Sequence, residues 1–177
     1  MTEEAIRRSR RQLLMMFGVA FGSMGLAYVV FYWITAGHTW GTTNKGTFVD
    51  PPRDVNSLAW QGATPVFETQ GKWWLWLVVD RCDAVCASTM HDQRAIHILL
   101  NKESDRVARA LLVGGADPGA LTEEALQKVR VLPKPDLPEG VYIVDPHGNL
   151  VLTYPVDTPP KPVLSDLQHL LKFSQIG

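Results

Sequence analysis

The chain has 177 residues, a formal net charge of −1 and a hydrophobic content of 46%. From residue 37 onward it carries 13 Lys and Arg against 16 Asp and Glu, with no basic patch or stripe. This balance argues against nucleic acid as a partner, and the composition favours one globular domain with a real hydrophobic core.

The N-terminal segment predicts a membrane anchor. Residues 12–44 contain no Asp, Glu, Lys or Arg, and residues 13–36 are almost wholly apolar. About 20 apolar residues span a bilayer, so we expect one transmembrane helix over residues 12–36. Four arginines lie within residues 1–11, whereas the next basic residue is Lys45. The positive-inside rule therefore predicts a cytoplasmic basic tail over residues 1–11 and an exported C-terminal part.

A cleaved export signal is the alternative interpretation of this segment. The stretch Ser9–Leu14 resembles a twin-arginine signal. However, the apolar run is longer than an ordinary signal core, and no Ala-x-Ala type of cleavage site follows it. These two features favour an uncleaved anchor in contact with membrane lipid.

The next segment predicts a linker and then the start of the domain. Residues 37–57 are rich in Gly, Thr, Asn and Pro, so we expect a linker there and a domain over residues 58–177. Short strands are predicted at Leu58–Gln61 and Val66–Glu68. The run Lys72–Asp80 is almost continuously hydrophobic, which predicts a central strand buried on both faces.

The remaining pattern predicts alternating helices and strands. We expect a helix over Asp83–Asn101 and a last helix after Pro160, which suits a first helical turn. The inward face of the first helix is predicted to carry Val85, Thr89, Ile96, Leu99 and Leu100, and that of the last Val163, Leu164, Leu167, Leu170 and Leu171. Between them we predict a strand at Arg106–Val113, a short helix at Thr122–Val129 and a hairpin of Val141–Asp145 with Leu150–Tyr154. This order predicts an α/β, thioredoxin-like domain with a central mixed sheet flanked by helices.

The two cysteines of the chain, Cys82 and Cys86, directly follow the central strand. A disulfide across so short a loop restrains the unfolded chain little, so a purely structural bridge is a weak explanation for the pair. A helix N-terminus favours the thiolate, as does Arg81, whereas Asp80 and Asp83 oppose it unless Asp83 caps the helix. We expect Cys82 to be the attacking thiol and Cys86 the resolving one.

These features together resemble the Sco/SenC family. The resemblance rests on the single anchor, the thioredoxin-like order, the Cys82-x-x-x-Cys86 spacing and the Tyr142–Gly148 sequence Tyr-Ile-Val-Asp-Pro-His-Gly, and it covers roughly residues 73–177. Family members are membrane-tethered copper or thiol–disulfide factors for the copper centre of cytochrome c oxidase. The resemblance implies a bacterial inner-membrane protein with a periplasmic domain and with an oxidase subunit or its assembly factors as partner. The linker and C-terminus also resemble small single-anchor proteins of proteobacterial oxidase gene clusters.

The chain departs from the family at the third copper ligand. Aligning residues 145–148 on the family's turn places Leu137 where Sco proteins have a histidine, and Pro138 where thioredoxins keep a cis-proline. A helix of 100° and 1.5 Å per residue puts His91 on another face than Cys86, and His97 about 16 Å along the axis. His38, His147 and His169 belong to other segments. Met90 is the one local soft donor, although packing is the more common role at such a position, and the Glu139 carboxylate is a poor ligand for Cu(I).

Three functions remain open on these residues. In the first, Cys82 and Cys86 form a catalytic thiol–disulfide pair acting on the copper-site cysteines of an oxidase, and no cofactor is required. In the second, the same two thiolates bind and transfer Cu(I) through an incomplete Sco-type site. In the third, the cysteines are incidental and the domain is a non-catalytic scaffold bound to the oxidase.

Overall fold

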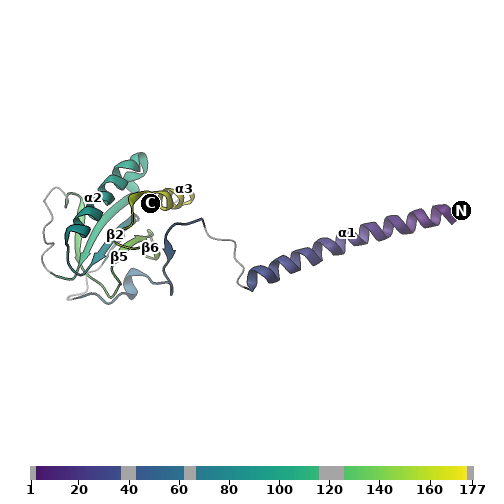
Figure 1. The fold of residues 1–177 in the computed structure, drawn as a ribbon, viewed down its shortest axis with the longest axis horizontal. Coiled ribbons are helices and arrows are strands. Elements are labelled where there is room, and N and C mark those ends of the chain that lie inside the picture. Colours follow the sequence, from purple (N-terminus) through teal and green to yellow (C-terminus); the bar gives the residue numbers. More distant parts are fainter. Residues whose placement is uncertain (1–2, 37–42, 62–66, 116–125, 175–177) are drawn as a thin grey trace. The chain divides into compact units, whose positions relative to one another are not determined.

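The computed structural model describes residues 3–36, 43–61, 67–115 and 126–174, which divide into two compact units, Met1–Thr43 and Asn44–Gly177. The first unit contains the helix α1 (Glu3–Thr35) (Figure 1). Its 29-residue stretch Arg7–Thr35 is the one described helix that is long and apolar enough to cross a membrane. The chain thus has a candidate single-pass membrane anchor near its N-terminus.

A mixed six-stranded sheet forms the centre of the second unit. The strands follow the spatial order β1-β6-β5-β2-β3-β4. β2 runs parallel to β3, and β3 parallel to β4, whereas β5 is antiparallel to β2 and to β6. Their bounds are β1 Thr47–Phe48, β2 Trp73–Val79, β3 Val107–Val113, β4 Val129–Pro133, β5 Gly140–Val144 and β6 Leu150–Tyr154. β2 is central in this order, and every one of its residues is buried.

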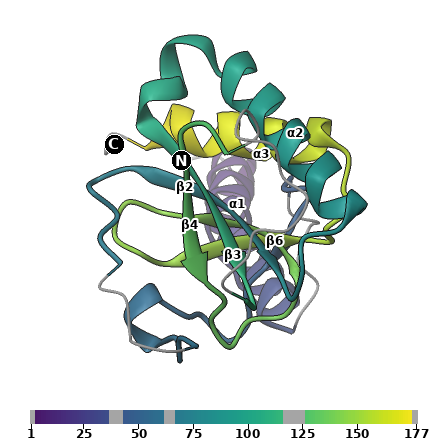
Figure 2. The same cartoon turned by 90° about the vertical axis from the view of Figure 1, so that its left-hand side faces the viewer.

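Two helices lie side by side on one face of the sheet, α2 (Ala84–Leu99) and α3 (Pro160–Phe173) (Figures 1 and 2). A short 3₁₀ helix, η2 (Asn101–Arg106), connects α2 to β3. The core under α2 and α3 contains the odd-numbered residues of β2 because alternate side chains of a strand point to opposite faces. It also contains Cys86, Met90 and Ile96 of α2 and Val163, Leu167 and Leu171 of α3.

The opposite face of the sheet is covered mainly by connecting segments. The even-numbered β2 residues Trp74, Trp76 and Val78 pack there, against residues that precede β2 and against the loop before β5. The covering side chains include Val55 of the 3₁₀ helix η1 (Val55–Ser57), Leu58, Phe67 and Leu137. Phe67 lies edge-on to Trp76, with 4.9 Å between ring centroids. We call these two sides the helix face and the aromatic face.

Several predicted elements are confirmed. The central strand, the following helix, the next strand, the hairpin and the last helix all form within a few residues of the predicted bounds. The predicted inward face of the first helix is confirmed in part: Thr89, Ile96 and Leu100 are buried, together with Cys86, Met90 and Gln93, whereas Val85 and Leu99 are exposed.

Other predictions need correction. Leu58–Gln61 forms no strand and makes only a single bridge from Trp60 to Pro135. The helix predicted at Thr122–Val129 lies largely outside the described residues, and its last residue, Val129, begins the strand β4, which the sequence pattern did not predict. This edge strand ends in Pro133 and half-exposes its side chains, so its hydrophobic pattern is weak.

The domain begins earlier than the predicted linker boundary. The second unit starts at Asn44, and Thr47 and Phe48 pair with β6. A buried carboxylate explains this, because Asp166 Oδ2 accepts hydrogen bonds from the backbone N–H of Lys45 (2.6 Å) and of Gly46 (2.8 Å). The hydroxyl of Tyr154 donates to the same oxygen at 2.8 Å. Residues 44–57 are therefore part of the folded domain rather than a free linker.

Candidate functional site

The two cysteines lie where the central strand passes into the first long helix of the domain. β2 ends at Val79 and α2 begins at Ala84. The side chain of Asp83 caps the helix by accepting hydrogen bonds from the backbone N–H of Val85 and of Cys86, each at 3.0 Å. Cys82 and Cys86 form a disulfide with 5.1 Å between their Cα atoms. The predicted position of the pair and the predicted N-cap are both confirmed.

The two sulfur-bearing residues differ in accessibility. Cys86 is 0% exposed and packs within the core of the helix face, together with Met90. Cys82 is only partly buried and packs at the margin of the same core. A second protein can therefore reach Cys82 more easily than Cys86.

A shallow depression surrounds Cys82. It is lined by Asp80, Arg81, Cys82, Asp83 and Glu139. Glu139 belongs to the loop before β5, and its Oε1 accepts a hydrogen bond from the backbone N–H of Asp80 at 2.7 Å. This bond fastens that loop beside Cys82, at the end of β2.

A buried lysine stabilises the same edge. The Lys134 side chain is mostly buried and forms an ion pair with the Asp80 carboxylate. Since an unpaired charge is costly to bury, this pair fixes the end of β2 against the chain that follows β4. Lys134 stands between Pro133 and Pro135 in the sequence, and no sequence pattern connects it with Asp80.

A groove lies along the first turns of α2, next to the cysteine loop. It is lined by Ala84, Val85, Ser88, Thr89, Asp92 and Asp157. The hydroxyl of Thr89 lies 2.9 Å from the carbonyl oxygen of Val85 and 2.8 Å from that of Val156, so it ties α2 to the chain after β6. No sequence pattern connects Asp157 with the cysteines, because only the tertiary structure brings it beside α2.

Leu137 does not lie where the alignment with Sco proteins requires. Its side chain is 5% exposed and packs in the core of the aromatic face, with Trp76 and Val144, whereas Cys86 belongs to the helix face. Pro138 is also not a cis-proline: among the described residues the cis peptide bond is Asp50–Pro51. Its carbonyl instead accepts a hydrogen bond from the Tyr142 hydroxyl at 3.0 Å.

The described histidines have other environments. His97 Nε2 lies 3.0 Å from the carbonyl oxygen of Val107, and burial lowers the pKa of this imidazole. The ring of His169 lies tilted beside that of Phe173, while His91 and His147 are exposed. His38 lies outside the described residues. Among the described residues, no three His, Cys, Asp or Glu side chains are grouped as metal ligands would be.

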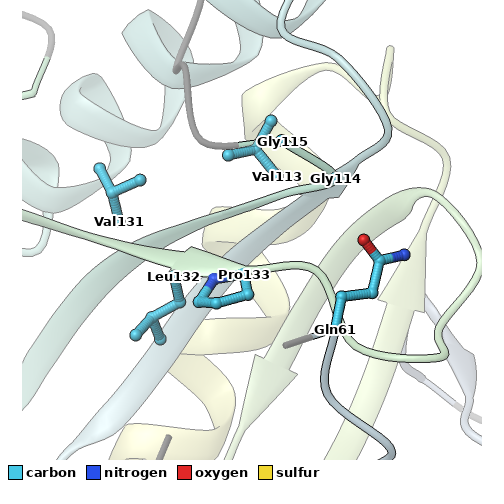
Figure 3. A pocket seen from close by; sticks show the side chains of 7 residues that line it. All are labelled: Gln61, Val113, Gly114, Gly115, Val131, Leu132 and Pro133. Carbon is cyan, nitrogen blue, oxygen red and sulfur yellow. The ribbon is translucent and has the colours of Figure 1, made fainter. Parts of the chain in front are cut away.

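Another depression lies at the C-terminal ends of β3 and β4 (Figure 3). Figure 3 shows the apolar side chains of Val113, Val131 and Leu132, with Pro133 and Gln61 beside them. Gly114 is required here, because a Cβ at this position would lie 2.9 Å from the carbonyl oxygen of Asp80. The described lining contains neither a thiol nor a titratable side chain, so we assign it no chemistry.

Comparison with known proteins identifies the fold. A family model described as the transmembrane-like, thioredoxin-like C-terminal domain matches residues 73–174. The apo Sco1 protein of Thermus thermophilus has a similar structure, with a TM-score of 0.54 and 21% identity over 73% of this chain and 99% of that chain. At this level of identity the likeness shows the fold alone, and it confirms the predicted thioredoxin-like domain of the Sco type.

Two further Sco structures are less similar. Copper-bound ScoI of Arabidopsis thaliana has a TM-score of 0.46 and 14% identity, over 59% of this chain and 86% of that chain. BsSco, described as a Sco-family cytochrome c oxidase assembly protein with a disulfide switch, has a TM-score of 0.42 and 14% identity, over 76% of this chain and 99% of that chain. No curated protein matches the sequence significantly.

Proposed function

Because the chain belongs to the family of transmembrane-like, thioredoxin-like C-terminal domains, we propose that it is a membrane-anchored thiol–disulfide reagent that acts on a protein partner through Cys82 and Cys86. One observation carries this proposal: a disulfide joins a partly exposed cysteine to a fully buried one at the start of α2. An accessible attacking sulfur backed by a buried resolving sulfur is the arrangement that two-step exchange requires.

The exchange proceeds in two steps from the reduced protein. The Cys82 thiolate attacks one sulfur of a partner disulfide, forming a mixed disulfide, and the other partner sulfur leaves as a thiolate that takes up a proton. Cys86 then loses its proton and attacks the Cys82 sulfur, which forms the Cys82–Cys86 disulfide and releases the second partner thiol. Two electrons pass to the partner, and an external dithiol must reduce Cys82–Cys86 again.

The backbone around Cys86 favours the second step. The first turn of α2 leaves N–H groups directed towards its N-terminus, and the partial positive charge there stabilises a thiolate. The Asp83 carboxylate accepts hydrogen bonds from the backbone N–H groups of Val85 and of Cys86. Among the side chains around Cys82, Arg81 also favours a thiolate, whereas Asp83 and Glu139 oppose it.

The resemblance to Sco proteins supports the choice of partner. We propose that the partner disulfide belongs to the copper-site cysteines of a cytochrome c oxidase subunit, or to an assembly factor of that enzyme. The role is then that of an accessory factor in oxidase assembly in a bacterial inner membrane, with residues 1–11 cytoplasmic and the folded domain periplasmic. A reporter enzyme that works only on the exported side of the membrane should be active when fused after Gly177. A reporter that works only in the cytoplasm should be inactive there.

Trapping of the mixed disulfide tests the function. Cys86→Ser should accumulate a disulfide between Cys82 and the partner in membranes that contain oxidase, because the resolving sulfur is missing. Cys82→Ser should trap nothing, since Cys86 is buried. If neither substitution impairs oxidase assembly, the thiol chemistry is incidental and the scaffold function is the better explanation.

Copper transfer is the second candidate. Reduction of the disulfide would leave two soft sulfurs close together at 5.1 Å between Cα atoms, and two thiolates can hold Cu(I) as cargo. Met90 is fully buried among apolar residues of the helix face, which favours packing as its role. Titration of the reduced full-length chain with Cu(I) against a competing chelator separates the two candidates, because thiol exchange alone requires no copper affinity.

A further inference from the structure

The groove beside the disulfide indicates what kind of partner segment reaches Cys82, and this inference rests on the proposed thiol–disulfide function. We propose that the groove binds a segment of the partner protein that carries an apolar side chain and a basic side chain next to the reactive cysteine. The groove is lined by Ala84, Val85, Ser88, Thr89, Asp92 and Asp157, and it starts at the residues that separate the two cysteines.

The apolar part of the groove comes from the first turn of α2. Val85 is 46% exposed, although it lies next to the fully buried Cys86. Ala84 is exposed as well. An apolar side chain of a bound segment would cover these two residues, which follow Cys82 by two and three positions in the sequence.

The charged part of the groove is acidic. Asp92 comes from α2 and Asp157 from the connection between β6 and α3. The His91 imidazole lies 4.0 Å from Asp92, between Nδ1 and Oδ1, and carries a charge only when protonated, while Asp157 forms no ion pair with a described residue. Two carboxylates without a permanent positive partner attract a basic side chain and disfavour an acidic one.

The depression around Cys82 does not reverse this charge. Of its acidic side chains, Asp80 is paired with Lys134, and Glu139 remains acidic beside Arg81. The surface on both sides of the reactive sulfur is therefore neutral to acidic.

The walls of the groove and of the depression around Cys82 are also held in place by hydrogen bonds, because Thr89 links α2 to Val156 and Glu139 links its loop to Asp80. A preformed surface loses little free energy to ordering when the partner binds.

Single-turnover exchange with model peptides tests the inference. The full-length chain in detergent micelles is reduced, freed of reductant and mixed with one of four disulfide-linked peptides. The residues beside the peptide cysteine are Leu-Arg, Leu-Glu, Ser-Arg or Ser-Glu. The amount of Cys82–Cys86 disulfide formed over time is measured by acid quenching, alkylation and mass spectrometry.

We expect the Leu-Arg peptide to react about tenfold faster than the Leu-Glu peptide at low salt, with the difference shrinking as salt screens the charges. Asp157→Lys should reduce this preference several-fold, and Val85→Ser should reduce the preference for Leu over Ser. Asp105→Lys is the matched control, because Asp105 is an exposed aspartate in η2 beyond the other end of α2. It should leave both preferences unchanged.

The possible outcomes distinguish a failure of the groove inference from a failure of the proposed thiol–disulfide function. Cys82-dependent exchange at equal rates with all four peptides would overturn the inference and leave the thiol–disulfide function standing. A preference for Leu-Arg that Asp157→Lys and Asp157→Asn do not alter would also overturn it, because the carboxylate would then not be the cause. Absence of exchange with every peptide would overturn the proposed function together with the inference.

Discussion

The two faces of the central sheet are built from the same strand but from different kinds of sequence. On the helix face, β2 is covered by α2 and α3, and Cys86 lies in that core. On the aromatic face, β2 is covered by Val55, Leu58 and Phe67 and by the loop that contains Leu137. The helix that starts directly after β2 can bring a thiol beside the end of the strand, whereas the aromatic face is assembled from segments far apart in sequence. The disulfide therefore lies at the helix face, whereas the described residues of the aromatic face supply packing.

The largest effect on stability should come from the aromatic face. Trp76 is completely buried and contacts Phe67 and Trp60 edge-on. Trp76→Ala should lower the free energy of unfolding by about 3–5 kcal/mol, because it removes a large side chain and leaves a cavity. Urea unfolding followed by circular dichroism measures this loss. Phe48→Ala is the control, since Phe48 is 53% exposed and should cost less than about 1 kcal/mol.

The two faces act independently only if Trp76→Ala leaves thiol exchange through Cys82 unchanged. At urea concentrations where the variant is still folded, its rate of thiol exchange through Cys82 should equal that of the parent chain. A slower rate in the folded variant would show that the two faces are coupled.

Leu137→His tests the assignment of Leu137 to the aromatic face. A histidine in that apolar core lacks a hydrogen-bond partner and should lower the free energy of unfolding by about 2–4 kcal/mol. The affinity of the reduced chain for Cu(I) should not rise, because the new side chain points away from the helix face. The control Leu137→Met keeps the volume and should cost less than about 1.5 kcal/mol. Tighter copper binding by Leu137→His would support the Sco alignment instead.

Asp166 tests how the segment before β1 is attached to the domain. Its Oδ2 accepts hydrogen bonds from the backbone of Lys45 and Gly46 and from the Tyr154 hydroxyl. Asp166→Ala leaves these donors without an acceptor and should cost about 1–3 kcal/mol. It should also speed trypsin cleavage after Lys45. Tyr154→Phe removes one of the three bonds, so it should cost less and leave the cleavage rate close to that of the parent; equal effects would contradict the role assigned to Asp166.

The smallest expected effect is a pH dependence that differs between the faces. Burial lowers the pKa of His97, which contacts Val107, below its ordinary value of 6.5. The unfolded chain then binds more protons than the folded one, so the unfolding free energy should fall as the pH drops from 6.5 through the folded pKa. Chemical denaturation at several pH values measures this slope. His97→Gln should flatten it, and an unchanged slope would show that another group is responsible.

An ion pair near the aromatic face responds in a lower pH range. The Arg53 guanidinium donates to Asp136 at 2.8 Å and lowers the pKa of that carboxyl below its ordinary value of 3.8. Its contribution should be present above pH 3.8 and be lost as the pH falls through the folded pKa. The pair is exposed, so the effect should be small. Arg53→Met should remove it without changing the slope near pH 6.

The local features of this protein follow from its amino-acid sequence. The apolar run before residue 36 predicts the long helix α1, and the run of seven buried residues Trp73–Val79 predicts a strand covered on both faces. Cys82 and Cys86 follow that strand directly, and Asp83 is the kind of residue that caps a helix, so the position of Cys86 on the first turn of α2, with Cys82 just before the cap, could be derived from order and spacing alone. Hydrophobic runs, caps and short spacings are local, and local physics fixes them.

The residues that surround the cysteines come from distant parts of the chain, and they meet only in the tertiary structure. Leu137 is a hydrophobic residue near a predicted loop, and nothing in its neighbours shows which face of the sheet it covers. Lys134 beside Asp80 and Asp157 beside Val85 are separated by 54 and by more than 70 positions, and their approach depends on how loops return to the sheet. The exposure of Val85 next to the buried Cys86 likewise depends on how α2 is rotated against the sheet. Helical periodicity limits this rotation, but the packing of α2 against β2 and α3 sets it.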